Sequence, residues 1–164
     1  MWGILVNFST ISHIEVWSMF RGWYEHAMDN KGRVSIPSKF RDFLSDKYSE
    51  SLIVTNFDRC LVCYPVEEWE TLERKASALP QLKKEVKAFQ RFFISGAVEC
   101  SLDAQGRILV PPFLRDFADL GKDVVLVGML KKIEIWSKAR WKDTFAQSQK
   151  KFEEFADVLA ELGI

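Results

Sequence analysis

Two pentapeptides in this chain contain residue types that can bind a phosphate or a guanine base. DNKGR at residues 29–33 and DAQGR at residues 103–107 each place an aspartate four residues before an arginine. The arginine guanidinium is a planar fork of donors that can bind a phosphate, or the O6 and N7 atoms of guanine. The chemistry of both segments therefore centres on Arg33 and Arg107.

The other residues of the pentapeptides are suited to building a turn. Because a carboxylate is repelled by phosphate, we expect Asp29 and Asp103 to orient the turn or its arginine. Glycine adopts the positive φ that hairpin turns need, which predicts that Gly32 and Gly106 shape them. Lys31 adds a second cation to the first segment only.

The two segments differ in charge. Residues 29–41 hold four basic residues against one acid, whereas residues 103–115 hold two against one. We therefore predict that Arg33 and Lys31 contribute more to the binding of an anionic partner than Arg107 does. Arg41 and Arg115 also recur, but each precedes Asp and Phe on an expected short helix, so a structural pairing is favoured over ligand contact.

Other chemistry is poorly supported by the sequence. Cys60 and Cys63 form a CxxC, but they fall in an expected strand, where positions three apart point to opposite faces. With only His13 and His26 in the chain, no second Cys/His pair completes a zinc site, and we expect no metal and no cofactor. The sequence contains no phosphate-binding glycine loop and no nucleophile–base pattern that would indicate an enzyme.

Composition predicts a folded protein of the cytoplasm. The 164 residues are 48% hydrophobic, with 23 basic and 23 acidic side chains, so net charge does not favour a nucleic-acid partner. A local basic face can still exist within a neutral total. Three cysteines are too few for a disulfide scaffold, and no apolar run is long enough to span a membrane. Residues 1–18 lack a basic start and are not an export signal; they are either a start-site overrun before Met19 or an extra strand or tail.

The chain contains one unit twice. Residues 22–43 align without gaps on residues 96–117, at an offset of 74, with nine of 22 positions identical. A second stretch aligns at an offset of 72, which places Trp69 on Trp141. Because one unit is too small to bury a core alone, we expect two copies to fold against each other with pseudo-twofold symmetry.

Each copy is predicted to contain a strand, a glycine turn, a second short strand, a short helix that begins at Pro37 or Pro111, and a second hairpin. Each copy then ends in helix. Ser137 is a candidate N-cap for the last one, which we expect to run to about Leu162. Its apolar stripe could pack on the body of the protein or form a contact between subunits; it comprises Phe145, Ser148, Phe152, Phe155, Leu159 and Leu162.

Several motifs together resemble the MraZ family of bacterial transcriptional regulators. They are MFRG…DNKGRVSIP…FRDFL, CLVCYPVEEWE, FFISGAVECSLDAQGRILVPPFLR and VVLVG…EIWS, and they span essentially residues 19–150. The resemblance implies an α+β fold, mainly β with helices, in which tandem SpoVT/AbrB-like units form a swapped-hairpin, double-psi-like β-barrel with flanking helices.

The resemblance also implies a function. It implies a ring-shaped homo-oligomer, associated with the nucleoid, that binds short promoter repeats in double-stranded DNA and represses its own division and cell-wall gene cluster. In the family the Asp-x-x-x-Arg motif contacts DNA, which here corresponds to residues 29–33 and 103–107. The alternative from a different class is a non-catalytic AbrB-like oligomerisation or antitoxin-type interaction module.

The pattern divides the chain into five parts. Residues 1–18 are an extension, 19–79 the first SpoVT/AbrB-like unit, 80–93 a connecting helix, 94–137 the second unit, and 138–164 a C-terminal amphipathic helix.

Overall fold

A computed structural model describes residues 19–164, so the expectation for residues 1–18 lies outside the described residues. The elements follow the duplicated sequence. The strands are β1 (Trp23–Ala27), β2 (Arg33–Ser35), β3 (Ser51–Asn56), β4 (Leu61–Pro65), β5 (Val98–Ser101), β6 (Arg107–Leu109), β7 (Asp123–Met129) and β8 (Lys132–Ser137). The helices are α2 (Ser38–Lys47), α3 (Val66–Ser77), α4 (Lys84–Phe89), the π-helical turn η1 (Gln90–Ile94), α5 (Pro112–Phe117), α6 (Lys138–Glu154) and α7 (Ala156–Glu161).

Local signals in the sequence set where the helices start. Pro37 and Pro111 occupy the N-cap positions of α2 and α5, where a missing N–H removes no helical hydrogen bond. Ser137 caps α6, because its hydroxyl accepts a hydrogen bond of 3.2 Å from the backbone N of Arg140. These three predictions are confirmed.

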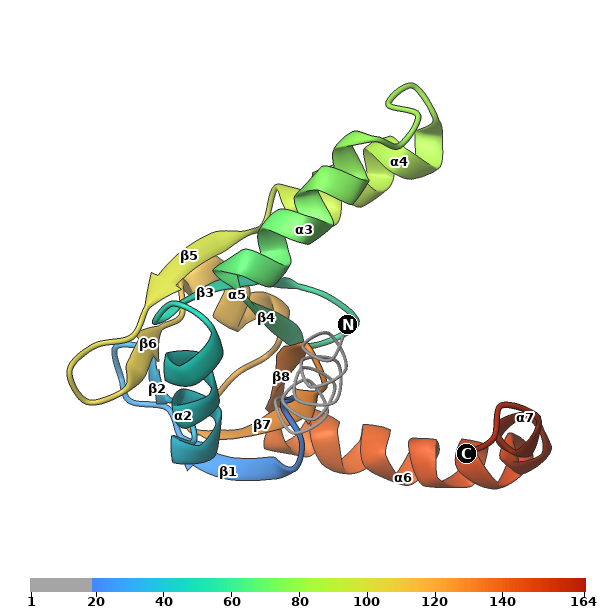
Figure 1. Ribbon diagram of the computed structural model, residues 1–164. Coiled ribbons are helices and arrows are strands. Elements are labelled where there is room, and N and C mark those ends of the chain that lie inside the picture. Colours follow the sequence, from blue (N-terminus) through green and yellow to red (C-terminus); the bar gives the residue numbers. More distant parts are fainter. Residues whose placement is uncertain (1–18) are drawn as a thin grey trace, which may run out of the picture.

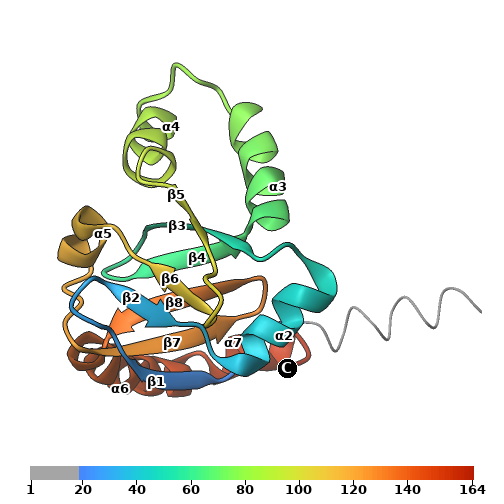
Figure 2. The same ribbon diagram turned by 90° about the vertical axis from the view of Figure 1, so that its left-hand side faces the viewer.

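The main sheet is built by exchange between the two halves. Its six antiparallel strands run in the order β1-β7-β8-β4-β3-β5 (Figure 2). Strand β1 of the first half pairs with β7 of the second, and β5 of the second pairs with β3 of the first. Neither half therefore has a complete sheet of its own, and the expected α+β class with mutual folding of the copies is confirmed.

The expected closed barrel is not present among the described residues. Strands β1 and β5 are the two edges of the six-stranded sheet, and β2 and β6 pair only with each other. The physical reason is that the turns after β1 and β5 carry the chain away from the sheet edges, and the three-residue strands that follow are too short to link both edges. They cross in front of the sheet as a separate ribbon (Figure 2).

One core serves both halves. Val34 of β2 lies opposite Ile108 of β6, and neither has exposed surface. Both belong to a cluster that also contains Phe20 from the start of the first unit, Phe40 from α2 and Leu114 from α5. Because the cluster draws on both halves, the position of the β2–β6 ribbon is fixed by the packing of the whole molecule.

Helix α3 projects from the body together with α4 and η1 (Figure 1). Its Trp69 packs against Phe93 of η1, with ring centroids 5.4 Å apart. The backbone carbonyls of Phe93 and Phe92 accept hydrogen bonds from Thr55 Oγ1 (2.7 Å) and Asn56 Nδ2 (2.8 Å), which tie η1 to β3. Helix α3, the helix that ends the first copy, is thus covered within its own chain.

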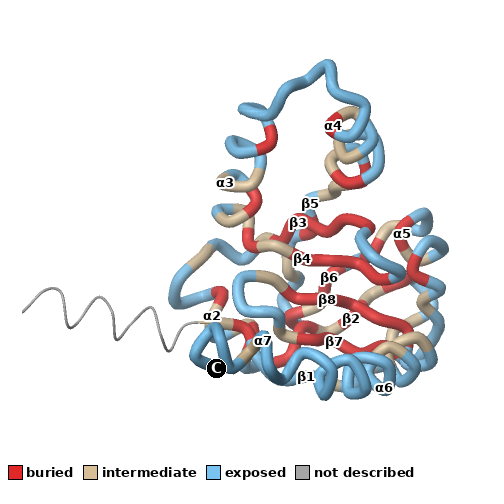
Figure 3. Tube along the Cα trace, turned by 90° about the vertical axis from the view of Figure 1, so that its right-hand side faces the viewer, coloured by how far each residue is buried: buried red, intermediate tan, exposed pale blue. Residues whose placement is uncertain are grey.

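Helix α6, the counterpart of α3, packs on the sheet only near its start, where Trp141 contacts Trp136; within residues 19–164 the rest of the helix is not covered. It projects along a different direction (Figure 1), has no buried residue, and is mostly exposed with α7 (Figure 3). Packing of the apolar stripe on the body is therefore wrong beyond Phe145, since Phe152 is 63% and Leu162 69% exposed. The predicted continuous helix is also interrupted at Phe155, where α6 ends and α7 begins. Within residues 19–164 no helix combines the length and apolar character needed to cross a bilayer.

Candidate nucleic-acid interface

The first turn is organised by the carboxylate of Asp29. Its Oδ1 accepts hydrogen bonds from the backbone N of Lys31 (3.0 Å) and of Arg33 (2.8 Å). Its Oδ2 accepts a hydrogen bond of 2.6 Å from Nε of Arg33, which is also an ion pair. Gly32 donates to the carbonyl of Asp29 at 3.0 Å and has φ of +90°. One aspartate thus fixes both the backbone of the turn and the direction of the arginine.

The second turn repeats this arrangement atom by atom. Oδ1 of Asp103 accepts from the backbone N of Gln105 and of Arg107, both at 2.9 Å. Oδ2 accepts from Nε of Arg107, also at 2.9 Å, and Gly106 has φ of +75°. The spacing of four residues is what allows one carboxylate to reach both the backbone and the side chain of the arginine.

These hydrogen bonds favour the ionised form of each aspartate. The backbone N–H of Arg33, first among the causes, lowers the pKa of Asp29 to about 2, and the guanidinium adds to the effect. The backbone N–H of Arg107 likewise lowers the pKa of Asp103. Both ion pairs are therefore formed at neutral pH. They use only Nε, and among residues 19–164 Nη1 and Nη2 of Arg33 and Arg107 have no partner.

Both arginines project from the same face of the β2–β6 ribbon. Arg33 lies opposite Leu109, and Ser35 opposite Arg107, so these four side chains share one face while Val34 and its partner fill the other. Diagonal neighbours of this kind lie about 7–8 Å apart. Side chains of Arg33 and Arg107 are 35% and 27% exposed. The sequence predicted that the two turns are related by pseudo-twofold symmetry. The structure adds that the two arginines are neighbours on one face of the ribbon.

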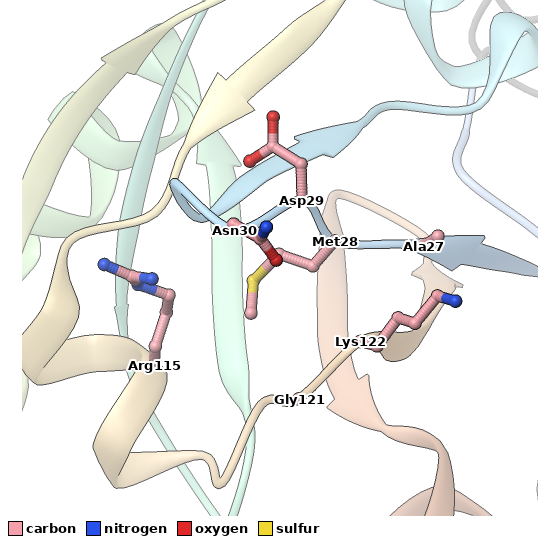
Figure 4. Close-up of a pocket in the computed structure, with 7 residues that line it drawn as sticks. All are labelled: Ala27, Met28, Asp29, Asn30, Arg115, Gly121 and Lys122. Atoms are coloured by element: carbon pink, nitrogen blue, oxygen red, sulfur yellow. The ribbon is translucent and has the colours of Figure 1, made fainter.

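Two further arginines, Arg41 and Arg115, lie next to the turns. The sequence favoured a structural role over DNA contact for both residues. In the described residues each side chain lies against a glycine of a turn, and Nε of Arg41 donates to the carbonyl of Ile36 at 3.0 Å. Arg115 and Asp29 border a depression of about 600 Å³ (Figure 4). The only signal in the sequence that these two arginines contact the turns was their recurrence at an offset of 74.

The cysteines and the basic residues of α4 lie elsewhere. Cys60, Cys63 and Cys100 are buried free thiols, and burial raises the pKa of each, to about 11 for Cys100. A thiol that stays protonated is a poor nucleophile and metal ligand. Lys84 and Arg91 are exposed on the helical projection. No group of three or more potential metal ligands occurs within residues 19–164.

Comparison with known proteins identifies the family. The model of the MraZ protein family, described as antitoxin-like, matches residues 19–92 and again residues 93–161. The chain belongs to the MraZ family. The two matches show that the family's unit occurs twice in this chain, in agreement with the internal repeat.

Relatives in this family cover most of the chain. The transcriptional regulator MraZ of Desulfitobacterium hafniense is 47% identical over 146 residues, which are 89% of this chain and 100% of that protein. The corresponding protein of Halothermothrix orenii is 45% identical with the same coverage. That of Syntrophobacter fumaroxidans is 44% identical over 145 residues, 88% of this chain and 97% of that protein. All three carry the name transcriptional regulator MraZ.

Proposed function

We propose that this protein is a transcriptional regulator that binds double-stranded DNA through the outer face of the β2–β6 ribbon and the two turns beside it. The observation that carries the proposal is the placement of Arg33 and Arg107 on one ribbon face, each held by its own aspartate. The names of the relatives support the regulatory role. The proposed contacts are Arg33, Arg107 and Lys31, with Asp29, Asp103, Gly32 and Gly106 shaping the site.

The geometry suits a major groove. A two-stranded ribbon fits into that groove, and the free Nη atoms of arginine match O6 and N7 of guanine. Because Nε is already bonded to the aspartate, less side-chain freedom is lost when the arginine binds DNA. A separation of about 7–8 Å between the arginines corresponds to roughly two base-pair steps of 3.4 Å. We infer that the pair reads bases about two steps apart, while Lys31 contacts phosphate.

We infer that the exchanged pairing of β1 with β7 and of β5 with β3 is the swapped-hairpin arrangement of tandem SpoVT/AbrB-like units, with the unit boundaries predicted from the sequence. The β2–β6 ribbon is likewise a joint product of both units, since β2 belongs to the first and β6 to the second. A regulator of this kind would act at the nucleoid in the cytoplasm.

The protein is further proposed to act as a head-to-tail homo-oligomer. Residues 66–73 at the start of α3 contain four acids and no base, whereas the equivalent residues 138–145 of α6 contain three bases and one acid. Opposite charges on the two equivalent helices favour contact between the first unit of one copy and the second unit of the next, a heterologous interface that closes into a ring. The exposed stripe of α6 and α7 would be buried in that contact.

Oligomerisation would compensate for the small number of cations. A neutral chain with two arginines and one lysine at its interface binds DNA weakly, and linking several copies raises the affinity through effective concentration. The expected targets are short repeats in the promoter of the protein's own gene cluster, with repression as the outcome. Deleting one repeat should then lower the affinity by on the order of a hundredfold. Affinity that is independent of repeat number would contradict this mechanism.

The direct test is footprinting on DNA upstream of the protein's own gene, followed by fluorescence anisotropy with operator and scrambled duplexes at physiological salt. We expect protection of repeated elements, and loss of binding in Arg33→Ala. Arg91→Ala is the matched control, because Arg91 is an exposed arginine on the helical projection outside the ribbon. Equal affinity for both duplexes would reject sequence-specific regulation.

One observation favours a second candidate, an antitoxin-type interaction module. The family is described as antitoxin-like, and an apolar surface lies beside the second turn, where Leu109 is 56% and Phe113 53% exposed. Rings of Phe92 and Phe117 lie 5.6 Å apart close to it. Two results together would support this alternative: equal affinity for operator and scrambled DNA, and binding of a partner protein that is lost in Phe113→Ser.

A further inference from the structure

Each DNA-facing turn is in contact with an arginine that belongs to the other half of the chain. Arg115 of α5 lies against Gly32 in the first turn: a methyl group built on Gly32 would lie 2.7 Å from Cζ and 2.8 Å from Nε of Arg115. These distances are far below van der Waals contact, so the guanidinium occupies the space that any larger residue at position 32 would need. Figure 4 shows Arg115 and the first turn on either side of the depression.

The second turn has the mirror relationship. Arg41 of α2 lies against Gly106, where a methyl group would be 2.5 Å from Cδ and Nη1 of Arg41. The backbone shows the same crossing. The carbonyl of Gly106 accepts a hydrogen bond of 2.9 Å from the N of Ile36, and the carbonyl of Gly32 accepts one of 2.9 Å from the N of Val110.

From this geometry we propose that Arg115 and Arg41 are positioning residues, each of which holds the DNA-contacting turn of the opposite half. Arg115 positions the turn that carries Arg33, and Arg41 positions the turn that carries Arg107. The inference rests on the proposed function, because it assigns a role to these residues in DNA binding.

The choice of residue types follows from the shape of the contact. Both turn glycines have a positive φ, which glycine adopts without strain. A Cβ at either position would also force the arginine side chain beside it to move. A guanidinium is planar and can cover a turn with its face, whereas the ammonium group of lysine is a compact point charge. The recurrence of the glycine and the arginine in both copies agrees with this contact, because each arginine lies against the glycine of the other copy.

The two contacts are not identical, which guides the choice of variant. Nε of Arg41 donates to the carbonyl of Ile36, whereas Nε of Arg115 is buried and has no hydrogen-bond partner among residues 19–164. Replacing Arg115 therefore removes a packing contact and leaves no carbonyl unpaired. Arg115→Ala is the cleaner probe, and Arg115→Lys, which retains the charge, serves if the alanine variant does not fold.

The first experiment is made on the free protein and needs no DNA. In amide NMR spectra, Arg115→Ala should shift the signals of Gly32 and Lys31 and leave Gly106 unchanged. Arg41→Ala should shift Gly106 and leave Gly32 unchanged. Shifts confined to the variant's own half would overturn the proposal. If wild-type protein binds no DNA, the proposed function fails, and this crossed pattern alone decides whether the turns are held from the opposite half.

The second experiment is a pair of double-mutant cycles on DNA affinity. Arg115→Ala should weaken binding on the order of tenfold in the wild-type background. That loss should largely vanish in an Arg33→Ala background and persist fully in an Arg107→Ala background. Coupling to Arg107 instead, or to neither arginine, would contradict the assignment. Arg91→Ala should be additive with every variant.

The salt dependence separates positioning from contact. Loss of a residue that binds phosphate reduces the slope of log K against log salt by about 0.9. Arg115→Ala should lower the affinity at every salt concentration with an unchanged slope. A reduced slope would show that Arg115 itself contacts DNA, which overturns its role as a positioning residue.

Discussion

The two turns have the same internal geometry and different surroundings. Each is held by one aspartate that accepts two backbone hydrogen bonds and one from arginine. Around the first turn the exposed residues include Lys31 and Lys39, whereas their counterparts around the second are Gln105 and Phe113. Duplication has thus preserved what builds the turn, while the residues that a partner would touch have diverged.

The largest expected effect concerns the shared core rather than the surfaces. Ile108→Ala should lower the free energy of unfolding by about 2–5 kcal/mol, because the side chain is fully buried between the halves. Both units should still unfold in one transition, since the sheet is exchanged between them. Thermal denaturation followed by circular dichroism measures this. Leu82→Ala, at an 88% exposed site, is the control and should change stability by less than about 0.5 kcal/mol. Two separate transitions in the variant would show that the halves fold independently.

The second prediction compares the two arginines directly. Arg33→Ala should weaken DNA binding by about 1–3 kcal/mol, and Arg107→Ala should weaken it less, because the first turn has a neighbouring lysine and the second does not. Gel-shift titration of both variants under the same conditions gives the two values. A larger loss for Arg107→Ala would show that the basic surroundings do not decide the contribution of each turn.

The third prediction exchanges the residues that differ between the turns. Lys31→Gln should weaken binding roughly threefold and reduce the salt slope by about 0.9, since one phosphate contact is lost. Gln105→Lys should have the opposite effect of similar size. Anisotropy titrations between low and physiological salt measure both. If neither variant changes the slope, the tips of the turns do not touch the DNA backbone.

The smallest effect is the dependence on pH. The backbone N–H of Arg33, and after it the guanidinium, lower the folded pKa of Asp29 to about 2, below its ordinary value of 3.8. The ionised carboxylate therefore favours the folded turn above pH 3.8, and this contribution is lost as the pH falls towards 2. Titration of the carboxyl carbons by NMR should show this shift, and a lowered pKa for Asp103 as well. Arg33→Ala should move the pKa of Asp29 part of the way back towards 3.8, because alanine removes the guanidinium and keeps the backbone N–H. An unchanged value would show that the backbone hydrogen bonds alone cause the shift.

Local features of this protein could be predicted from the sequence because their causes are local. The helix starts next to Pro37, Pro111 and Ser137 follow from residues within a few positions of each other. The barrel prediction failed because closure depends on strands far apart in the chain. The sequence also left open whether the apolar stripe packs on the body of the protein or on another subunit, since an amphipathic pattern does not specify what covers it.

By itself the sequence determined the two turns, since a carboxylate four residues before an arginine meets it through hydrogen bonds that need no other part of the chain. It also determined the family, through the repeat of that unit. Only the tertiary structure decided that Arg33 and Arg107 share one ribbon and that Arg115 lies on the turn of the other half. Two similar copies could in principle pair within themselves or with each other, and the common core of residues from both halves selects the exchanged arrangement.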